Sequence, residues 1–76
     1  MNEFEKLCQW TERLSKIKGF ISAEIGYVVT GLDGVPRIRC CFCFGMKHEF
    51  FYSMDDAQVY VDRKLAKADG ILFRKF

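Results

Sequence analysis

Two segments of alternating polarity, joined through an Asp-Gly pair, constrain the fold more than any other feature of this sequence. In residues 20–30 and 37–44 apolar and polar side chains alternate. A period of two with many β-branched residues is typical of half-buried strands. Asp33-Gly34 lies between the segments and favours a two-residue type I′ turn. The sequence therefore predicts an antiparallel hairpin with one apolar face.

The expected turn also predicts which residues pair across the hairpin. With Asp33 and Gly34 as turn residues, apolar side chains meet apolar side chains: Val29 with Ile38, Tyr27 with Cys40, Ile25 with Phe42 and Ala23 with Phe44. A slip of one residue would turn this set to the other face, so pattern and turn chemistry agree on the register. The opposite face then carries mainly polar and thiol side chains: Glu24, Thr30, Arg37, Arg39, Cys41 and Cys43.

A helix is predicted on each side of the strand region. Residues 3–18 begin after Asn2, a favourable N-cap, and end before Gly19. Their apolar stripe is formed by Leu7, Trp10, Leu14 and Ile17, widened by Phe4 and Cys8. Residues 54–69 follow Ser53, a second N-cap, and precede Gly70. Their stripe is formed by Ala57, Val61, Leu65 and Ala68.

Residues 48–52 predict a short third strand after a turn at residues 45–47. Two registers remain open for this strand. A two-residue turn at Met46-Lys47 places Phe51 in the core and leaves Phe50 and Tyr52 outside, whereas a three-residue turn reverses this arrangement. The apolar tail, residues 71–76, predicts a short fourth strand or an extended segment packed on the sheet.

The predicted fold is a single α+β domain, residues 1–76, in the order α-β-β-β-α. Each helix has one apolar stripe, so the expected architecture is a two-layer sandwich with both helices on one face of an antiparallel sheet. The other sheet face stays open. This element order is similar to that of double-stranded-RNA-binding domains. In that family a lysine cluster begins the second helix and holds phosphates. Here Asp55-Asp56 stands at that place, so the resemblance transfers no binding residue.

The cysteines and the single histidine are the residues that could form a metal or catalytic site. Cys41 and Cys43 lie two residues apart, about 6.6 Å along a strand. The sulfurs of a tetrahedral zinc site lie closer together, and a fourth ligand besides His48 is missing. A thiol nucleophile beside His48 would need a third group to orient it. The prediction is therefore no metal, no cofactor and no enzyme. A chain of 76 residues also has little room for a small-molecule pocket.

The expected function is protein binding through the open sheet face, to a larger partner or to a second copy as a homodimer. The candidate binding residues are Arg37, Arg39, Cys41, Cys43, Lys47 and Tyr52. In size and style the chain resembles small inhibitors and regulators of bacteria, phages and other mobile elements, including anti-CRISPR-type proteins. A nucleic-acid-binding face of arginines and an aromatic ring is the alternative. The pI of 8.4 gives it no further support.

Sequence composition also leads to an expected location. The acidic start Met1-Asn2-Glu3 is unlike a signal peptide, which predicts a cytoplasmic protein without disulfides. No run of the sequence approaches the ~18 apolar residues of a membrane span. We therefore expect no membrane contact.

Overall fold

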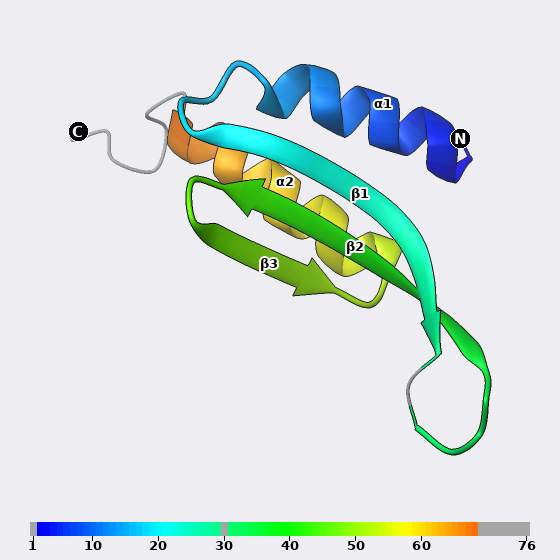
Figure 1. Cartoon of the computed structure of the whole chain (residues 1–76). Coiled ribbons are helices and arrows are strands. Elements are labelled where there is room, and N and C mark those ends of the chain that lie inside the picture. The colour runs from blue at the N-terminus through cyan, green and yellow to red at the C-terminus, as the bar shows by residue number, and fades with distance from the viewer. Residues whose placement is uncertain (1, 30, 69–76) are drawn as a thin grey trace.

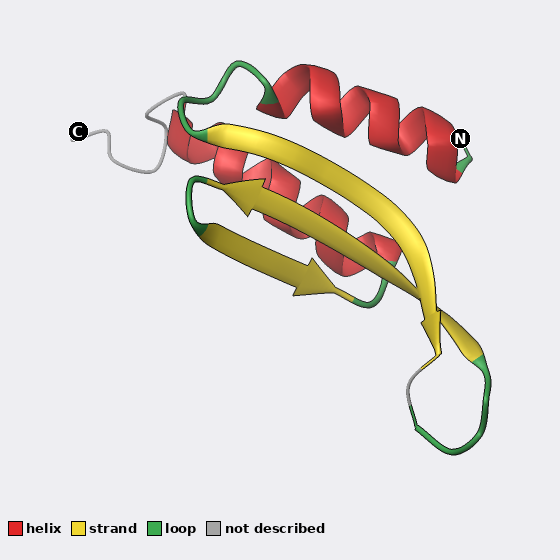
Figure 2. Ribbon diagram, in the orientation of Figure 1, coloured by secondary structure: helices red, strands yellow, loops and turns green. Residues whose placement is uncertain are grey.

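The computed structural model describes residues 2–29 and 31–68 and confirms the predicted order of elements. The elements are α1 (Glu3–Leu14), β1 (Phe20–Val29), β2 (Pro36–Phe44), β3 (Lys47–Phe51) and α2 (Met54–Ala68). The sheet is antiparallel in the order β1-β2-β3. In Figures 1 and 2, α1 runs beside β1, and α2 lies behind the sheet, where it is seen between β1 and β2. The fold is the expected α+β arrangement with an open sheet. The predicted strand at 71–76 lies outside the described residues.

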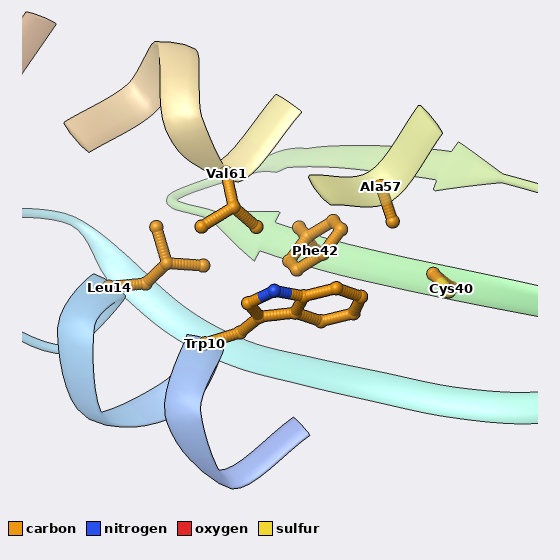
Figure 3. Close-up of a cluster of buried hydrophobic side chains, with 6 residues drawn as sticks. All are labelled: Trp10, Leu14, Cys40, Phe42, Ala57 and Val61. Carbon is orange, nitrogen blue, oxygen red and sulfur yellow. The ribbon is translucent and has the colours of Figure 1, made fainter. Parts of the chain in front are cut away.

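The core lies between the two helices and the central strand. Six buried residues form it, as Figure 3 shows: Trp10 and Leu14 from α1, Cys40 and Phe42 from β2, and Ala57 and Val61 from α2. Phe42 lies at the centre of an aromatic group. Its ring centroid is 5.6 Å from that of Trp10, 5.0 Å from that of Tyr60 and 6.0 Å from that of Phe51. These contacts hold both helices on the same sheet face.

A polar bridge fixes α1 against α2 at the rim of this core. The indole Nε1 of Trp10 donates a hydrogen bond to Gln58 Oε1 at 2.9 Å, and Lys6 Nζ donates to the same oxygen at 2.8 Å. A tryptophan buried in this way needs a partner for its N–H. Gln58 supplies one from the facing helix, so the apolar packing leaves the indole N–H satisfied.

Both predicted N-caps are confirmed, whereas the end of α1 differs from the prediction. Asn2 Oδ1 accepts from Glu5 N at 2.8 Å, and Ser53 Oγ accepts from Asp56 N at 3.0 Å. However, α1 ends at Leu14 rather than at residue 18. After Leu14, Ile17 N donates a hydrogen bond to Leu14 O at 2.9 Å. This bond reaches three residues back, whereas the bonds of an α-helix reach four. Gly19 still takes a left-handed φ of 93°, now in the turn into β1.

The stripe of α1 is narrower than predicted, because Phe4 and Cys8 are exposed. Helix α1 packs on β1 and α2, and its Trp10 reaches Phe42 of β2. Within residues 2–29 and 31–68, no element covers the outer side of α1, where Phe4 and Cys8 lie.

The predicted register of the β1–β2 hairpin is wrong by two residues. Val29 pairs with Pro36 and Ala23 with Phe42, because the connection spans residues 30–35 rather than two residues. A type I′ turn would require a positive φ at Asp33, and no described non-glycine residue has one. Instead, Asp33 Oδ1 accepts from Val35 N at 3.1 Å in an Asx-type turn. From Ser22 to Val29 a shift of two keeps each side chain on its predicted face. A bulge between Phe20 and Ser22 reverses the faces before that point, so Phe20 packs on the core and Ile21 is exposed.

Neither of the two registers left open for β3 is observed: the turn is formed by Gly45-Met46 rather than by Met46-Lys47 or residues 45–47. The pairing is shifted by two residues from that of the predicted two-residue turn, so the two faces of β3 are the same as in that prediction. Lys47 pairs with Phe44 after a turn at Gly45-Met46, so Phe51 lies opposite Cys40 on the core side. Phe50 lies opposite Cys41 on the open side. Gly45 N also donates to Gly19 O at 2.8 Å. This bond ties the β2–β3 turn to the start of β1.

Candidate functional site

The sheet face away from the helices is defined by the register, because residues paired across antiparallel strands share a face. We call this surface the open face. It is formed by Ser22, Glu24, Gly26 and Val28 of β1, by Arg37, Arg39, Cys41 and Cys43 of β2, and by His48 and Phe50 of β3. Four of the six candidate residues predicted from the sequence are therefore brought together here.

The other two candidates lie elsewhere. Lys47 pairs with Phe44, which places it on the helix side of the sheet. Tyr52 is exposed but follows the last residue of β3, in the connection to α2. The sequence could not separate these two from the others, because the β2–β3 turn decides the face of Lys47 and the end of β3 decides the position of Tyr52.

Three side chains of the open face form a compact group that we call the thiol–imidazole cluster: Cys41, Cys43 and His48. Cys43 Sγ lies 2.9 Å from His48 Nδ1 and 3.8 Å from Cys41 Sγ. The sulfurs are thus much closer than the spacing of about 6.6 Å along the strand on which the sequence prediction relied. Both cysteines are buried although they face away from the helices, and His48 is exposed.

The electrostatic surroundings of the cluster favour the neutral thiol at Cys41. Burial raises the pKa of the Cys41 thiol, and the neighbouring Cys43 and Glu24 raise it further, while Arg39 acts in the opposite direction. All four cysteines of the chain are free thiols. The cluster therefore offers two thiol sulfurs and one imidazole nitrogen as ligand atoms.

Next to the cluster, Arg39 lies over the ring of Phe50. The guanidinium carbon is 5.3 Å from the ring centroid, which is cation–π geometry. The Phe50 side chain keeps 46% of its surface exposed. A hollow of about 380 Å³ runs along β1 around Gly26 and is lined by open-face residues such as Glu24 and Arg39 and also by Leu7 of α1. The open face thus combines an aromatic–arginine platform with a shallow depression.

A second surface was missed by sequence reasoning. Figure 1 shows the far end of the β1–β2 hairpin extending beyond both helices. We call this part, residues 27–29 and 31–38, the hairpin arm. It exposes Leu32 fully, Tyr27 by 63%, Val29 by 59% and Val35 by 49%. Tyr27 and Val29 lie on the face that was predicted to be apolar and covered, but in the described part of the chain no helix covers them. The available signal was the pair Leu32 and Val35, which are apolar in a turn.

The base and the tip of the hairpin arm are held by polar contacts. At the base, Tyr27 Oη donates to Glu3 Oε1 at 2.6 Å, and this bond raises the pKa of Tyr27. At the tip, Arg37 and Asp33 form an ion pair with an N–O distance of 2.6 Å. The base of the arm is thus bonded to α1, and its tip is held by an ion pair between two of its own residues.

The ion pair at the tip predicts a pH effect. The Arg37 guanidinium, together with Val35 N–H, holds the pKa of Asp33 below its usual range. The stabilisation that the ionised carboxylate brings is therefore present at neutral pH and lost as the pH falls through the lowered pKa. Arg37→Gln is expected to move the Asp33 pKa upward in an NMR titration of the carboxyl carbon. Arg39→Gln serves as the control. An Asp33 pKa unmoved by Arg37→Gln would contradict the pairing.

Comparison with known proteins identifies no relative: no family model, curated protein or solved structure matches this chain. Within residues 2–29 and 31–68, no helix is long and apolar enough to cross a membrane. The open face and the hairpin arm are therefore the features from which a function is inferred.

Proposed function

We propose that this chain is a non-catalytic protein-binding domain that docks its hairpin arm and open face against a larger partner. The observation that carries the proposal is the exposure of four apolar side chains on one projecting hairpin: Tyr27, Val29, Leu32 and Val35. Clustered exposed apolar residues are typical of interaction sites. Here they leave the domain on an arm that does not contribute to its core.

The residue types on the two surfaces support this proposal. Interface cores are enriched in aromatic residues and arginine and depleted in unpaired charge. Tyr27 lies on the arm, and Phe50 with Arg39 lies on the open face. The acidic group at the arm tip is already paired with Arg37. A partner that covers the tip therefore meets apolar side chains and a charge pair, and not an isolated carboxylate.

The shape suggests how binding would act on the partner. A narrow hairpin fits an apolar groove on a larger protein, and the rest of the domain then covers the surface around that groove. We propose that the chain blocks or adapts the partner in this way, as an inhibitor or regulator in the style of small mobile-element proteins. Four free cysteines suit the reducing cytoplasm, where we place this function.

The proposal is tested by comparing the wild-type full chain with two variants, one changed in the hairpin arm and one changed elsewhere. Leu32→Asp combined with Val35→Asp places charge on the arm, and Val59→Asp places one on an exposed position of α2. Partners recovered from lysate of the source cells with the wild-type chain are purified, and their affinities for all three proteins are measured by calorimetry. The arm variant is expected to bind at least about 30-fold more weakly, as for loss of a hot spot of about 2 kcal/mol. Val59→Asp is expected to bind like the wild type.

Self-association is followed in parallel by sedimentation over a range of concentrations. A dimer that the arm variant abolishes would identify a second copy as the partner. Equal binding by the arm variant and the wild type would contradict the proposal. The proposal would also be contradicted if the chain stays an 8.9 kDa monomer and no recovered protein loses its binding when the arm is changed.

A nucleic-acid-binding function is the second candidate, and the Arg39–Phe50 platform favours it, since bases stack on such rings. Other charges oppose it. Arg37 is paired with Asp33, Glu24 lies on the open face, and Asp55 and Asp56 begin α2. Single-stranded oligonucleotides at low salt distinguish the two functions. Binding that falls steeply with salt and is lost in Arg39→Ala would favour nucleic acid over protein.

A further inference from the structure

The ligand atoms of Cys41, Cys43 and His48 all lie within 4.8 Å of one another. We propose that this thiol–imidazole cluster binds one Zn²⁺ ion through the two sulfurs and the imidazole nitrogen, with a water in the fourth position. This inference does not depend on protein binding. It revises the expectation of no metal, which relied on a sulfur separation that the structure does not have.

The spacing of the two sulfurs suits zinc. Tetrahedral coordination with Zn–S bonds of about 2.3 Å places two sulfurs about 3.8 Å apart. The observed distance between Cys41 Sγ and Cys43 Sγ is 3.8 Å. Two cysteines at alternate positions of one strand reach this spacing because their side chains lean toward each other on the same face. The sulfur pair therefore needs no rearrangement to take a metal.

The imidazole requires a small movement. A zinc-bound sulfur and nitrogen lie about 3.6 Å apart in the same geometry. Cys43 Sγ and His48 Nδ1 are 2.9 Å apart, at hydrogen-bond distance. His48 is exposed and belongs to the short edge strand β3, so its ring can move outward without disturbing the core. The hydrogen bond marks the position from which the ring turns onto the metal.

The charges of the three ligands balance the ion. Binding releases the protons of both thiols, and two thiolates with a neutral imidazole neutralise Zn²⁺. No electron transfer is involved. Thiolate and imidazole donors select zinc over magnesium or calcium, which prefer oxygen ligands. The other two cysteines are not part of the site, because Cys40 lies in the core and Cys8 lies on the outer side of α1.

The position of the ligands explains what the ion would do in this fold. Cys43 and His48 are direct partners across the β2–β3 ladder, and Cys41 is the next open-face residue on β2. The metal would therefore join β3 to the central strand on the face that the helices leave uncovered. Among the described residues, no further histidine, cysteine or acidic side chain joins the group as a fourth ligand. Three protein ligands and one water are the pattern of zinc sites with an exchangeable position.

The site is tested with Co²⁺ as a spectroscopic substitute, added to the reduced, chelator-treated full chain. We expect one Co²⁺ per chain, a thiolate-to-cobalt charge-transfer band in the near ultraviolet, and the intense visible bands of tetrahedral cobalt. Zn²⁺ is expected to remove these bands by displacement. Absence of the charge-transfer band at excess Co²⁺ would overturn the proposal.

Single substitutions show which side chains bind the ion. Loss of a direct ligand should cost more than the ~10–100-fold that loss of a supporting residue costs at metal sites. Cys43→Ser and His48→Gln are expected to weaken binding by that amount or more. His48 is exposed, so its replacement leaves the fold intact. Cys8→Ser is the matched control and is expected to bind like the wild type. Equal binding by His48→Gln and wild type, or loss of binding in Cys8→Ser, would contradict the assignment.

Discussion

Replacing Phe42 with alanine is expected to unfold most of the chain at room temperature. The Phe42 side chain is fully buried and contacts the rings of Trp10, Tyr60 and Phe51. Truncating a buried phenylalanine costs about 3–5 kcal/mol, since the burial is lost and a cavity remains. A core of this size contributes a net stability of about 3–5 kcal/mol. One substitution therefore removes as much free energy of unfolding as the domain holds.

Urea denaturation followed by the fluorescence of Trp10, the only tryptophan, measures this effect. Phe4→Ala is the matched control, because the same atoms are removed from an exposed position of α1. Its free energy of unfolding is expected to stay within about 0.5 kcal/mol of the wild type. A folded Phe42→Ala protein with an unchanged denaturation midpoint would show that the core is not where the structure places it.

Val61→Asp is expected to have the second large effect, by detaching α2 from the sheet. Val61 is fully buried between Leu14 and Phe42 in the core. A carboxylate there has no partner, and burying an unpaired charge costs several kcal/mol even after its pKa has shifted. Helix α2 supplies one half of the helical layer. The variant is therefore expected to lose cooperative unfolding rather than to show a lower midpoint alone.

Val59→Asp makes the same substitution two residues earlier on the same helix, at an exposed position. Its circular dichroism spectrum and thermal transition are expected to match those of the wild type within a few degrees. A cooperative transition in Val61→Asp, or equal destabilisation by both variants, would contradict the predicted orientation of α2.

Most of the fold was predictable because local signals agreed with one another. The caps at Asn2 and Ser53, the stripes through Trp10 and Val61, and the alternation around Phe42 all point to one covered sheet face. The register was missed because an Asp-Gly pair favours a two-residue turn, whereas the Asp33 side chain closes a longer one. From Ser22 onward the shift by two residues preserved the faces, so the predicted open face was still correct there.

The candidate sites were less predictable, because they depend on distances and coverage. Alternation alone placed Cys41 and Cys43 on one face but could not show that their sulfurs approach to 3.8 Å. Likewise, the apolar face of β1 was identified, yet only the length of the helices decides that Tyr27 and Val29 stay exposed. Helix α1 begins at Glu3, whose carboxylate accepts a hydrogen bond from the Tyr27 hydroxyl. The strands continue beyond this contact, so α1 does not cover them there.

The hairpin arm also divides the chain into two levels of protection against hydrogen exchange. Amides of β2 near Phe42 lie beneath both helices and exchange only when the whole domain opens. Beyond Tyr27 neither described helix covers the ladder, so its amides exchange through local fraying at a much lower free energy. The arm can therefore change its shape against a bound surface without weakening the body that carries it.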